Sequence, residues 1–181
     1  MIDTAEMETK KVLETARKHS LKKQIKDIVI ATTTGETGVL ASEIFDEKFN
    51  IIAVTHSTGF KETGNQELLE ENKIKMLEKN IKIFTGPMIF HSWNDYYRKK
   101  YGSMMPTTII ADTLRIFGQG TKVAVEIIMM AMDAGLISNQ QVMGIGGTGR
   151  GADTILIAEP RNSKKLFDMK IKEIVAKPMQ W

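Results

Sequence analysis

A chain of 181 residues that is 42% hydrophobic is long enough to bury a substantial core, so we expect residues 1–181 to form a single domain. It has no cysteine, which excludes a structural disulfide, a thiolate nucleophile and a cysteine-ligated metal site. The net charge of +3 comes from lysines interleaved with acidic residues, a pattern of solvated helix faces that does not favour nucleic-acid binding.

The first expected element is a helix. Residues 4–20 carry apolar side chains at helical spacing, and Asp3 followed by Glu6 resembles a capping box. The segment before it lacks the basic and apolar regions of a secretion signal. The most apolar stretch of the chain, 123–132, is short and carries Glu126, so we expect a cytoplasmic protein that does not insert into a membrane.

Strands that lead into polar loops follow. Asp27–Ala31 is rich in β-branched residues, and a threonine-rich loop, Thr32–Gly38, separates it from a second helical pattern. The order recurs at 51–54, where a strand precedes the loop 55–59 and a charged helix. A further short strand is expected at 81–84. Strands that alternate with helices predict parallel pairing and helices on both faces of the sheet.

The second half of the chain departs from simple alternation. A short aromatic helix is expected at 91–101, and 107–136 should form two helices that meet at Gly118–Gly120. Strands are expected at 141–145 and 154–158; the loop between them is too short for a parallel crossover, so the second should be antiparallel. Residues 170–176 are predicted as an edge strand protected by charged side chains. The fold class is therefore α/β, a mostly parallel doubly wound sheet whose last core strand is antiparallel.

Gly144–Gly149 matches the spacing G-x-G-x-x-G of dinucleotide-binding proteins. That fingerprint requires a helix to open directly after it, because the helix N-terminus holds the pyrophosphate. Here a β-branched strand follows instead. We interpret the segment Gly146–Asp153, called the glycine loop below, as a hairpin loop shaped for a ligand.

The threonine loop, Thr32–Gly38, is the better candidate for an anion site. It joins the carboxyl end of a strand to a helix N-terminus, where free N–H groups and the helix dipole favour negative charge. Glu36 would repel a phosphate unless its carboxylate points away or caps the helix. A polar helix cap without a ligand is the alternative. No lysine follows the loop as in a Walker motif, so hydrolysis of a nucleoside triphosphate is not expected.

The loops after parallel strands gather at one edge of a sheet, so we expect the threonine loop, 55–59, 85–86 and the glycine loop to face one crevice. His56 would serve there as an acid or base, or as a hydrogen-bonding wall residue. Arg150 would pair with a phosphate, or lie at a surface or subunit interface. Asp153 would accept a hydrogen bond from the ligand, or anchor the hairpin turn.

The histidines, the aromatic residues and the methionines give little further indication of a chemical activity. The three histidines have no metal-ligand spacing, and no metal is expected. The aromatic residues of 93–101 would stack on a flat ligand or serve in packing. The methionines at 129, 130 and 132 would pack a helix or form an apolar oligomer contact, so a homo-oligomer stays open.

The order of these elements, together with Ala31–Gly38, Phe117–Val123 and Gly146–Thr154, resembles the stand-alone proteins similar to the pyruvate kinase C-terminal domain. The resemblance implies a three-layer α/β/α fold and FMN as a small phosphorylated ligand, while the family's reaction is not established. In pyruvate kinase the corresponding domain is regulatory, and its first strand–helix loop holds a phosphate of a sugar bisphosphate. The barrel that carries the kinase reaction has no counterpart here.

On this resemblance we expect an FMN-binding protein, whether or not it is an enzyme, and as the alternative a non-catalytic sensor of a phosphorylated metabolite. The phosphate is assigned to the threonine loop, and the rest of the ligand to the segments that face it. The expected ligand-binding residues are Thr32, Thr33, Thr34, Gly35, Thr37, His56, Ser57, Thr58, Gly118, Gln119, Gly146, Gly147, Thr148, Gly149, Arg150, Ala152 and Asp153.

Overall fold

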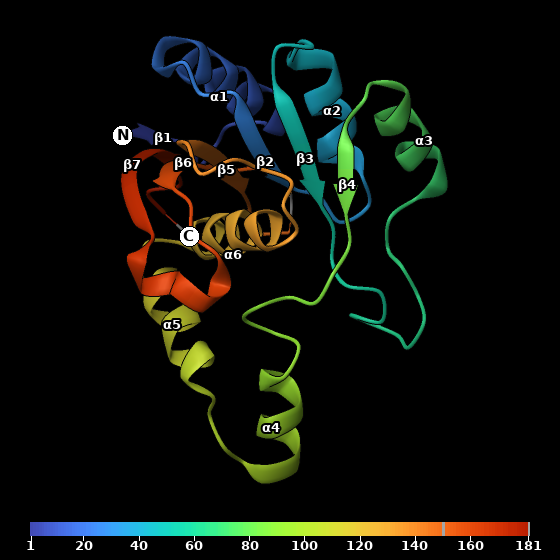
Figure 1. Ribbon diagram of the computed structural model, residues 1–181, viewed down its shortest axis with the longest axis vertical. Helices are drawn as coiled ribbons and strands as arrows, with labels where there is room; N and C mark the ends of the chain where they lie inside the picture. The colour runs from blue at the N-terminus through green and yellow to red at the C-terminus, as the bar shows by residue number, and fades with distance from the viewer. Residues whose placement is uncertain (150, 181) are drawn as a thin grey trace.

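A seven-stranded sheet in the order β1-β7-β6-β5-β2-β3-β4 lies at the centre of the molecule (Figure 1). The computed structural model describes residues 1–149 and 151–180. The strands are β1 (Ile2–Asp3), β2 (Asp27–Ala31), β3 (Asn50–Val54), β4 (Lys82–Phe84), β5 (Val142–Gly146), β6 (Thr154–Glu159) and β7 (Lys170–Lys177).

Strand directions follow from the lengths of the connections. β2 pairs in parallel with both β3 and β5, and β3 pairs in parallel with β4. β6 is antiparallel to both of its neighbours, β5 and β7. The short connection between β5 and β6 permits only a hairpin, which confirms the predicted antiparallel strand.

Helices cover both faces of the sheet and give the three layers of an α/β/α fold. One core cluster joins α1, α2 and α3 to one face, through side chains such as Leu13, Ala41 and Met76. The second joins α5 and α6 to the other face, with Ala111 and Ile128 among its members. The helices are α1 (Thr9–Lys23), α2 (Glu36–Ile44), α3 (Glu70–Glu78), α4 (Asn94–Tyr101), α5 (Pro106–Arg115), α6 (Gln119–Asp133) and the short 3-10 helix η1 (Ser163–Asp168).

The first helix begins later than predicted, at Thr9 rather than residue 4. Residues 2 and 3 instead form β1, which pairs in parallel with the end of β7. The carboxylate of Asp3 accepts hydrogen bonds from the N–H groups of Ala5 and Met179, so it caps a turn and not a helix. The prediction of an edge strand at 170–176 was correspondingly incomplete, because β1 lies outside the carboxyl end of β7.

The predicted break at Gly118–Gly120 and the short aromatic helix are both present. α5 ends at Arg115, and α6 begins at Gln119 behind Gly118. Figure 1 shows α4 projecting from the body of the molecule, well away from the sheet. Its tyrosines contact one another, as where Tyr97 packs on Tyr101, and Trp93, the residue before the helix, is exposed. Within the described part of the chain, no helix is long and apolar enough to span a bilayer.

Candidate functional site

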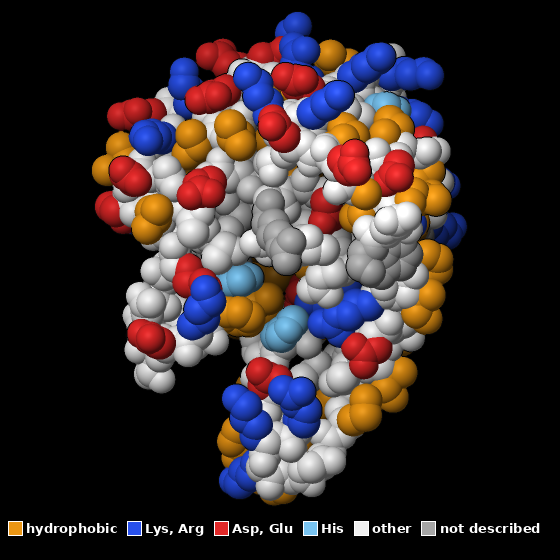
Figure 2. Space-filling model, turned by 180° about the vertical axis from the view of Figure 1, so that it is seen from behind, with side chains coloured by type: hydrophobic (Ala, Val, Ile, Leu, Met, Phe, Trp, Pro, Cys, Tyr) orange, Lys and Arg blue, Asp and Glu red, His pale blue; other side chains and the backbone are white. Residues whose placement is uncertain are grey.

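A crevice of about 780 Å³ lies at the carboxyl ends of the parallel strands. Figure 2 shows the molecule hollowed on one face, with two histidine side chains at the hollow. The threonine loop, the loop after β3, the first turn of α6 and the glycine loop all contribute to its wall. Of the residues expected to bind a ligand, it is lined by Thr32, Thr33, Thr34, Thr37, His56, Gln119, Gly147, Thr148 and Gly149.

The threonine loop presents backbone N–H groups that have no protein partner. Thr32 donates its N–H to the carbonyl of Val54, and the Gly38 N–H reaches the hydroxyl of Thr32. Between them, the N–H groups of residues 33–37 donate no hydrogen bond within the described residues. The hydroxyls of Thr33, Thr34 and Thr37 make none there either. These groups lie at the N-terminus of α2, where the helix dipole is positive.

Packing against α3 fixes the shape of this loop. The carbonyl of Thr34 accepts hydrogen bonds from the N–H of Leu69 and from the side-chain amide of Asn72. Gly35 has φ +98°, and a Cβ there would lie 2.6 Å from the Cβ of Asn72. Gly35 is therefore needed for backbone conformation and close packing, and it does not line the crevice.

Glu36 is exposed and lines the crevice beside the threonines. Its position in the first turn of α2 is favourable toward the helix dipole. The same position places a carboxylate in the wall of the site. Glu36 is therefore the feature of this loop that opposes an anionic ligand.

The glycine loop is held by its own aspartate. The carboxylate of Asp153 accepts hydrogen bonds from the hydroxyls of Thr148 and Thr154, at 2.9 and 2.6 Å. Ala152 is buried and donates its N–H to the hydroxyl of Thr9. These contacts correspond to the anchoring alternative for Asp153.

The other expected residues that the structure describes do not line the crevice. Gly146 is buried beneath α6, and Gly118 precedes the first residue of that helix. Ser57 and Thr58 lie on the loop after β3, where the Thr58 hydroxyl accepts a hydrogen bond from Gln66. Arg150 lies outside the described residues. The assignment of all these residues to a ligand stays a prediction.

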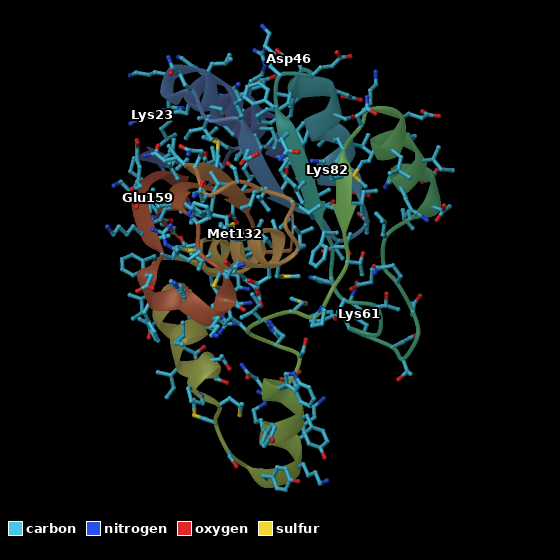
Figure 3. All side chains as sticks on the ribbon, in the orientation of Figure 1. Lys23, Asp46, Lys61, Lys82, Met132 and Glu159 are labelled. Carbon is cyan, nitrogen blue, oxygen red and sulfur yellow. The ribbon has the colours of Figure 1, made fainter. Side chains whose placement is uncertain are left out.

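His56 belongs to an ionic cluster with Glu67 and Lys61, and of these three residues only His56 was predicted from the sequence. Its Nδ1 lies 2.8 Å from Oε2 of Glu67, and Lys61 pairs with the other carboxylate oxygen. Burial raises the pKa of Glu67, but hydrogen bonds from Lys61 and His56 outweigh it and leave the pKa below its usual value. Figure 3 shows Lys61 on the loop after β3, beyond the end of β4. The side chains of His56, Lys61 and Glu67 all line the crevice.

A second cluster lies on α6. Lys122 is only 1% exposed and pairs with Glu126 one turn later. Its Nζ lies 3.2 Å from Nδ1 of His91 and 5.4 Å from the centre of the Phe90 ring. Burial lowers the pKa of Lys122, although Glu126 favours the charged form. The other oxygen of Glu126 accepts the N–H of Phe90 at 2.6 Å, so the pair also fixes the segment that carries His91.

Only one pair among the residues of these two clusters could have been predicted from a sequence pattern. Lys122 and Glu126 are four residues apart within an otherwise apolar helix, where a charged pair must be buried together. Glu67 gave no such signal, because it lies among other acidic residues. No group of three or more possible metal ligands occurs among residues 1–149 and 151–180.

Protonation of His91 should destabilise the protein as the pH falls. Burial, and next the charge of Lys122, lower the pKa of His91 below its usual value of 6.5. The unfolded chain then binds a proton that the folded chain rejects. This contribution to stability is complete above pH 6.5 and is lost as the pH falls from there toward the folded pKa. We expect His91→Gln to make the fall in unfolding free energy between pH ~7 and ~5 shallower in urea titrations.

The control for this prediction is His19→Gln. His19 lies on α1, where its Nδ1 contacts the carbonyl of Thr15, and it does not line the crevice. An identical pH dependence in the wild type and His91→Gln would contradict the prediction.

The topology defines an α/β protein, with a crevice at the carboxyl ends of its parallel strands. No protein-family profile matches the sequence. Among solved structures, the chain is similar to a pyruvate kinase from Cryptosporidium parvum, with 16% identity and a TM-score of 0.45 over 86% of this chain and 23% of that one. It is also similar to an NH3-dependent NAD synthetase from Campylobacter jejuni, with 16% identity and a TM-score of 0.38 over 74% of this chain and 53% of that one. The chain thus spans less than a quarter of that pyruvate kinase, and similarity at this level supports no inference about activity.

Proposed function

We propose that the crevice binds FMN, with the phosphate on the N–H groups of residues 33–37. One observation carries this proposal: Thr33, Thr34, Glu36 and Thr37 line a crevice at the N-terminus of α2, and their N–H groups and threonine hydroxyls have no hydrogen-bond partner among the described residues. Such an arrangement offers a phosphate several hydrogen bonds and a favourable dipole. The resemblance of the threonine and glycine loops to the FMN-associated family supports the choice of ligand.

The rest of the crevice suits the remainder of FMN in size and composition. Its volume of about 780 Å³ falls within the range of small-molecule sites. Leu40, Phe60, Met88 and Val123 supply apolar wall against which a flat ring system can pack. Gln119 lies on the same wall and offers an amide to the ribityl chain or the ring.

A second candidate is a sensor of a phosphorylated metabolite without a flavin. The observation that favours it is the ionisable part of the wall, which includes His56, His91 and Lys122. These groups match a polar, hydroxylated ligand better than an apolar ring. Both candidates place the phosphate on the threonine loop, and kinase activity is part of neither.

Identification of the retained ligand tests the first candidate. The purified protein is denatured, and the released molecule is examined by absorbance and mass; a flavin spectrum and the mass of FMN are the expected result. A colourless protein whose melting temperature FMN does not raise would exclude FMN. A rise with sugar phosphates alone would select the second candidate, since only ligands that bind the native state stabilise it.

Glu36→Gln should strengthen binding of the phosphate. Removal of one negative charge about 4 Å from a phosphate is worth roughly 1 kcal/mol in water, which is about a fivefold change in the Kd for FMN. Isothermal titration measures the Kd for FMN and for riboflavin. The Kd for riboflavin, which has no phosphate, should not change. Glu43→Gln, the same change on an exposed residue of the last turn of α2, is the matched control. A gain of the same size in Glu43→Gln would contradict a local effect.

Thr34→Glu should have the opposite effect. The new carboxylate would stand among the free N–H groups and compete with the phosphate for them. We expect the affinity for FMN to fall at least tenfold, about 1.4 kcal/mol, and that for riboflavin to change little. Equal weakening of both ligands in the same titrations would show that the phosphate binds elsewhere.

A further inference from the structure

The two histidines of the crevice differ in their hydrogen-bonding partners: one faces a carboxylate, which accepts, and the other faces an ammonium group, which donates. Nδ1 of His56 faces the carboxylate of Glu67, which is an acceptor when ionised. Nδ1 of neutral His56 must therefore carry the proton, and Nε2 has a free lone pair. A carboxylate behind an imidazole fixes this tautomer and the orientation of the ring.

His91 is held in the other tautomer. Nδ1 of His91 faces the ammonium group of Lys122, which donates hydrogen bonds and accepts none. Nδ1 is therefore the acceptor, and the proton of the neutral ring is on Nε2. The buried carboxylate of Glu126 balances the charge of Lys122 and keeps the ammonium in place.

Neither Nε2 of His56 nor Nε2 of His91 has a hydrogen-bond partner in the part of the chain that the structure describes. Both rings line the crevice, and both contact the ring of Phe60, with centroid distances of 4.2 Å for His56 and 5.9 Å for His91. Figure 2 shows pale blue histidine atoms next to hydrophobic atoms at the hollow. A ring nitrogen with a free lone pair and a ring N–H thus belong to two histidines that contact the same phenyl ring in the wall of the crevice.

We propose that His56 and His91 are the base and the acid of a proton-transfer reaction on a phosphorylated carbonyl compound, such as an aldose or ketose phosphate. The inference rests on the phosphate site of the proposed function and concerns its second candidate ligand. The phosphate on the threonine loop anchors the compound, and its carbonyl end reaches the two histidines.

The reaction is balanced without an oxidant or reductant. Nε2 of His56 removes a proton from the carbon next to the carbonyl, and the C–H electron pair forms a C=C bond. The carbonyl π pair moves to oxygen, where Nε2–H of His91 donates a hydrogen bond and then the proton. Protonated His56 returns a proton to either carbon of the enediol, and Nε2 of His91 takes a proton back from the hydroxyl that becomes the carbonyl, which returns the compound or gives its aldose–ketose isomer.

The test is hydrogen–deuterium exchange at carbon. The full chain is incubated in D₂O with dihydroxyacetone phosphate and with ribose 5-phosphate, and loss of the α-C–H signal is followed by proton NMR. We expect exchange with at least one probe and little with its unphosphorylated counterpart. His56→Gln and His91→Gln should each slow it about 100-fold or more, the usual size of a general acid–base contribution.

Three comparisons separate chemistry from structure. Glu67→Gln should slow exchange with less effect on the Kd of the probe, because Glu67 acts by holding His56. His19→Gln, on α1, should leave the rate unchanged. FMN should inhibit exchange in competition with the probe, since both ligands need the threonine loop.

The outcomes are distinct. If the probes raise the melting temperature but no exchange occurs, the acid–base pair is overturned and the phosphate site stands. If neither the probes nor FMN bind, the proposed function fails and this inference fails with it. Exchange that persists in Thr34→Glu, or that FMN fails to inhibit although FMN raises the melting temperature, takes place outside the crevice and also overturns the inference.

Discussion

Glu126→Gln should lower the free energy of unfolding by about 3–5 kcal/mol, because it leaves the buried ammonium of Lys122 without a counter-charge. Glutamine retains a side-chain oxygen for the N–H of Phe90, so the change isolates the loss of charge from the loss of that hydrogen bond. Urea titrations of the wild type and the variant at neutral pH measure the difference.

Two further variants control this prediction. Glu159→Gln removes the same charge from a partly exposed ion pair with Lys172, and its effect on unfolding should be hardly measurable. Lys122→Met combined with Glu126→Gln removes both buried charges, keeps an acceptor for the N–H of Phe90, and should recover most of the stability lost in Glu126→Gln. A loss in Glu126→Gln no larger than in Glu159→Gln would mean that water reaches the Lys122 ammonium.

The buried pair also links stability to the site. Glu126 joins α6 to the segment that carries His91, and Lys122 contacts the imidazole itself. An apolar pair would preserve the packing of α6 but give His91 no ammonium to face. Burying Lys122 and Glu126 has a desolvation cost that an apolar pair of similar volume would not have, so packing alone does not account for the pair.

The position of the crevice was predictable because it follows from chain topology. Strand–loop–helix order at Asp27–Gly38 predicts a parallel sheet, and parallel strands bring their following loops to one edge. The crevice confirms this for the threonine loop, for the loop after β3 and for the glycine loop. The antiparallel β6 was likewise fixed by the length of the loop that precedes it.

The parts that were missed depend on contacts between distant residues. Local patterning predicted a helix from residue 4, whereas Thr4 bonds to the carbonyls of Asp153 and Lys177 at the other end of the chain. The pairing of Glu67 with His56 likewise requires the loop between β3 and α3 to fold back on itself. Neither contact leaves a periodic or compositional signal in the residues involved.

Gly146→Ala should destabilise the fold by about 3 kcal/mol or more, because the new Cβ has no room between β5 and α6. It would lie 2.9 Å from the backbone nitrogen of Ala124 and closer still to the carbonyl oxygen of Gly120. Both are helix backbone atoms, so α6 would have to move off the sheet, and overpacking of this kind costs 1–3 kcal/mol or more.

The matched control is Gly144→Ala, two residues earlier on the same strand. Its Cβ would meet chiefly the flexible end of Ile128, at 2.7 Å, which can rotate away. We therefore expect a smaller loss of stability in urea titrations than for Gly146→Ala, and equal losses would contradict the argument. Because α6 carries Gln119 and Lys122 to the crevice, any Gly146→Ala protein that folds should also bind FMN more weakly. The glycine spacing of Gly144–Gly149 matches a dinucleotide fingerprint, but Gly146 has another use: it lets α6 pack closely against β5 and so places Gln119 and Lys122 at the crevice.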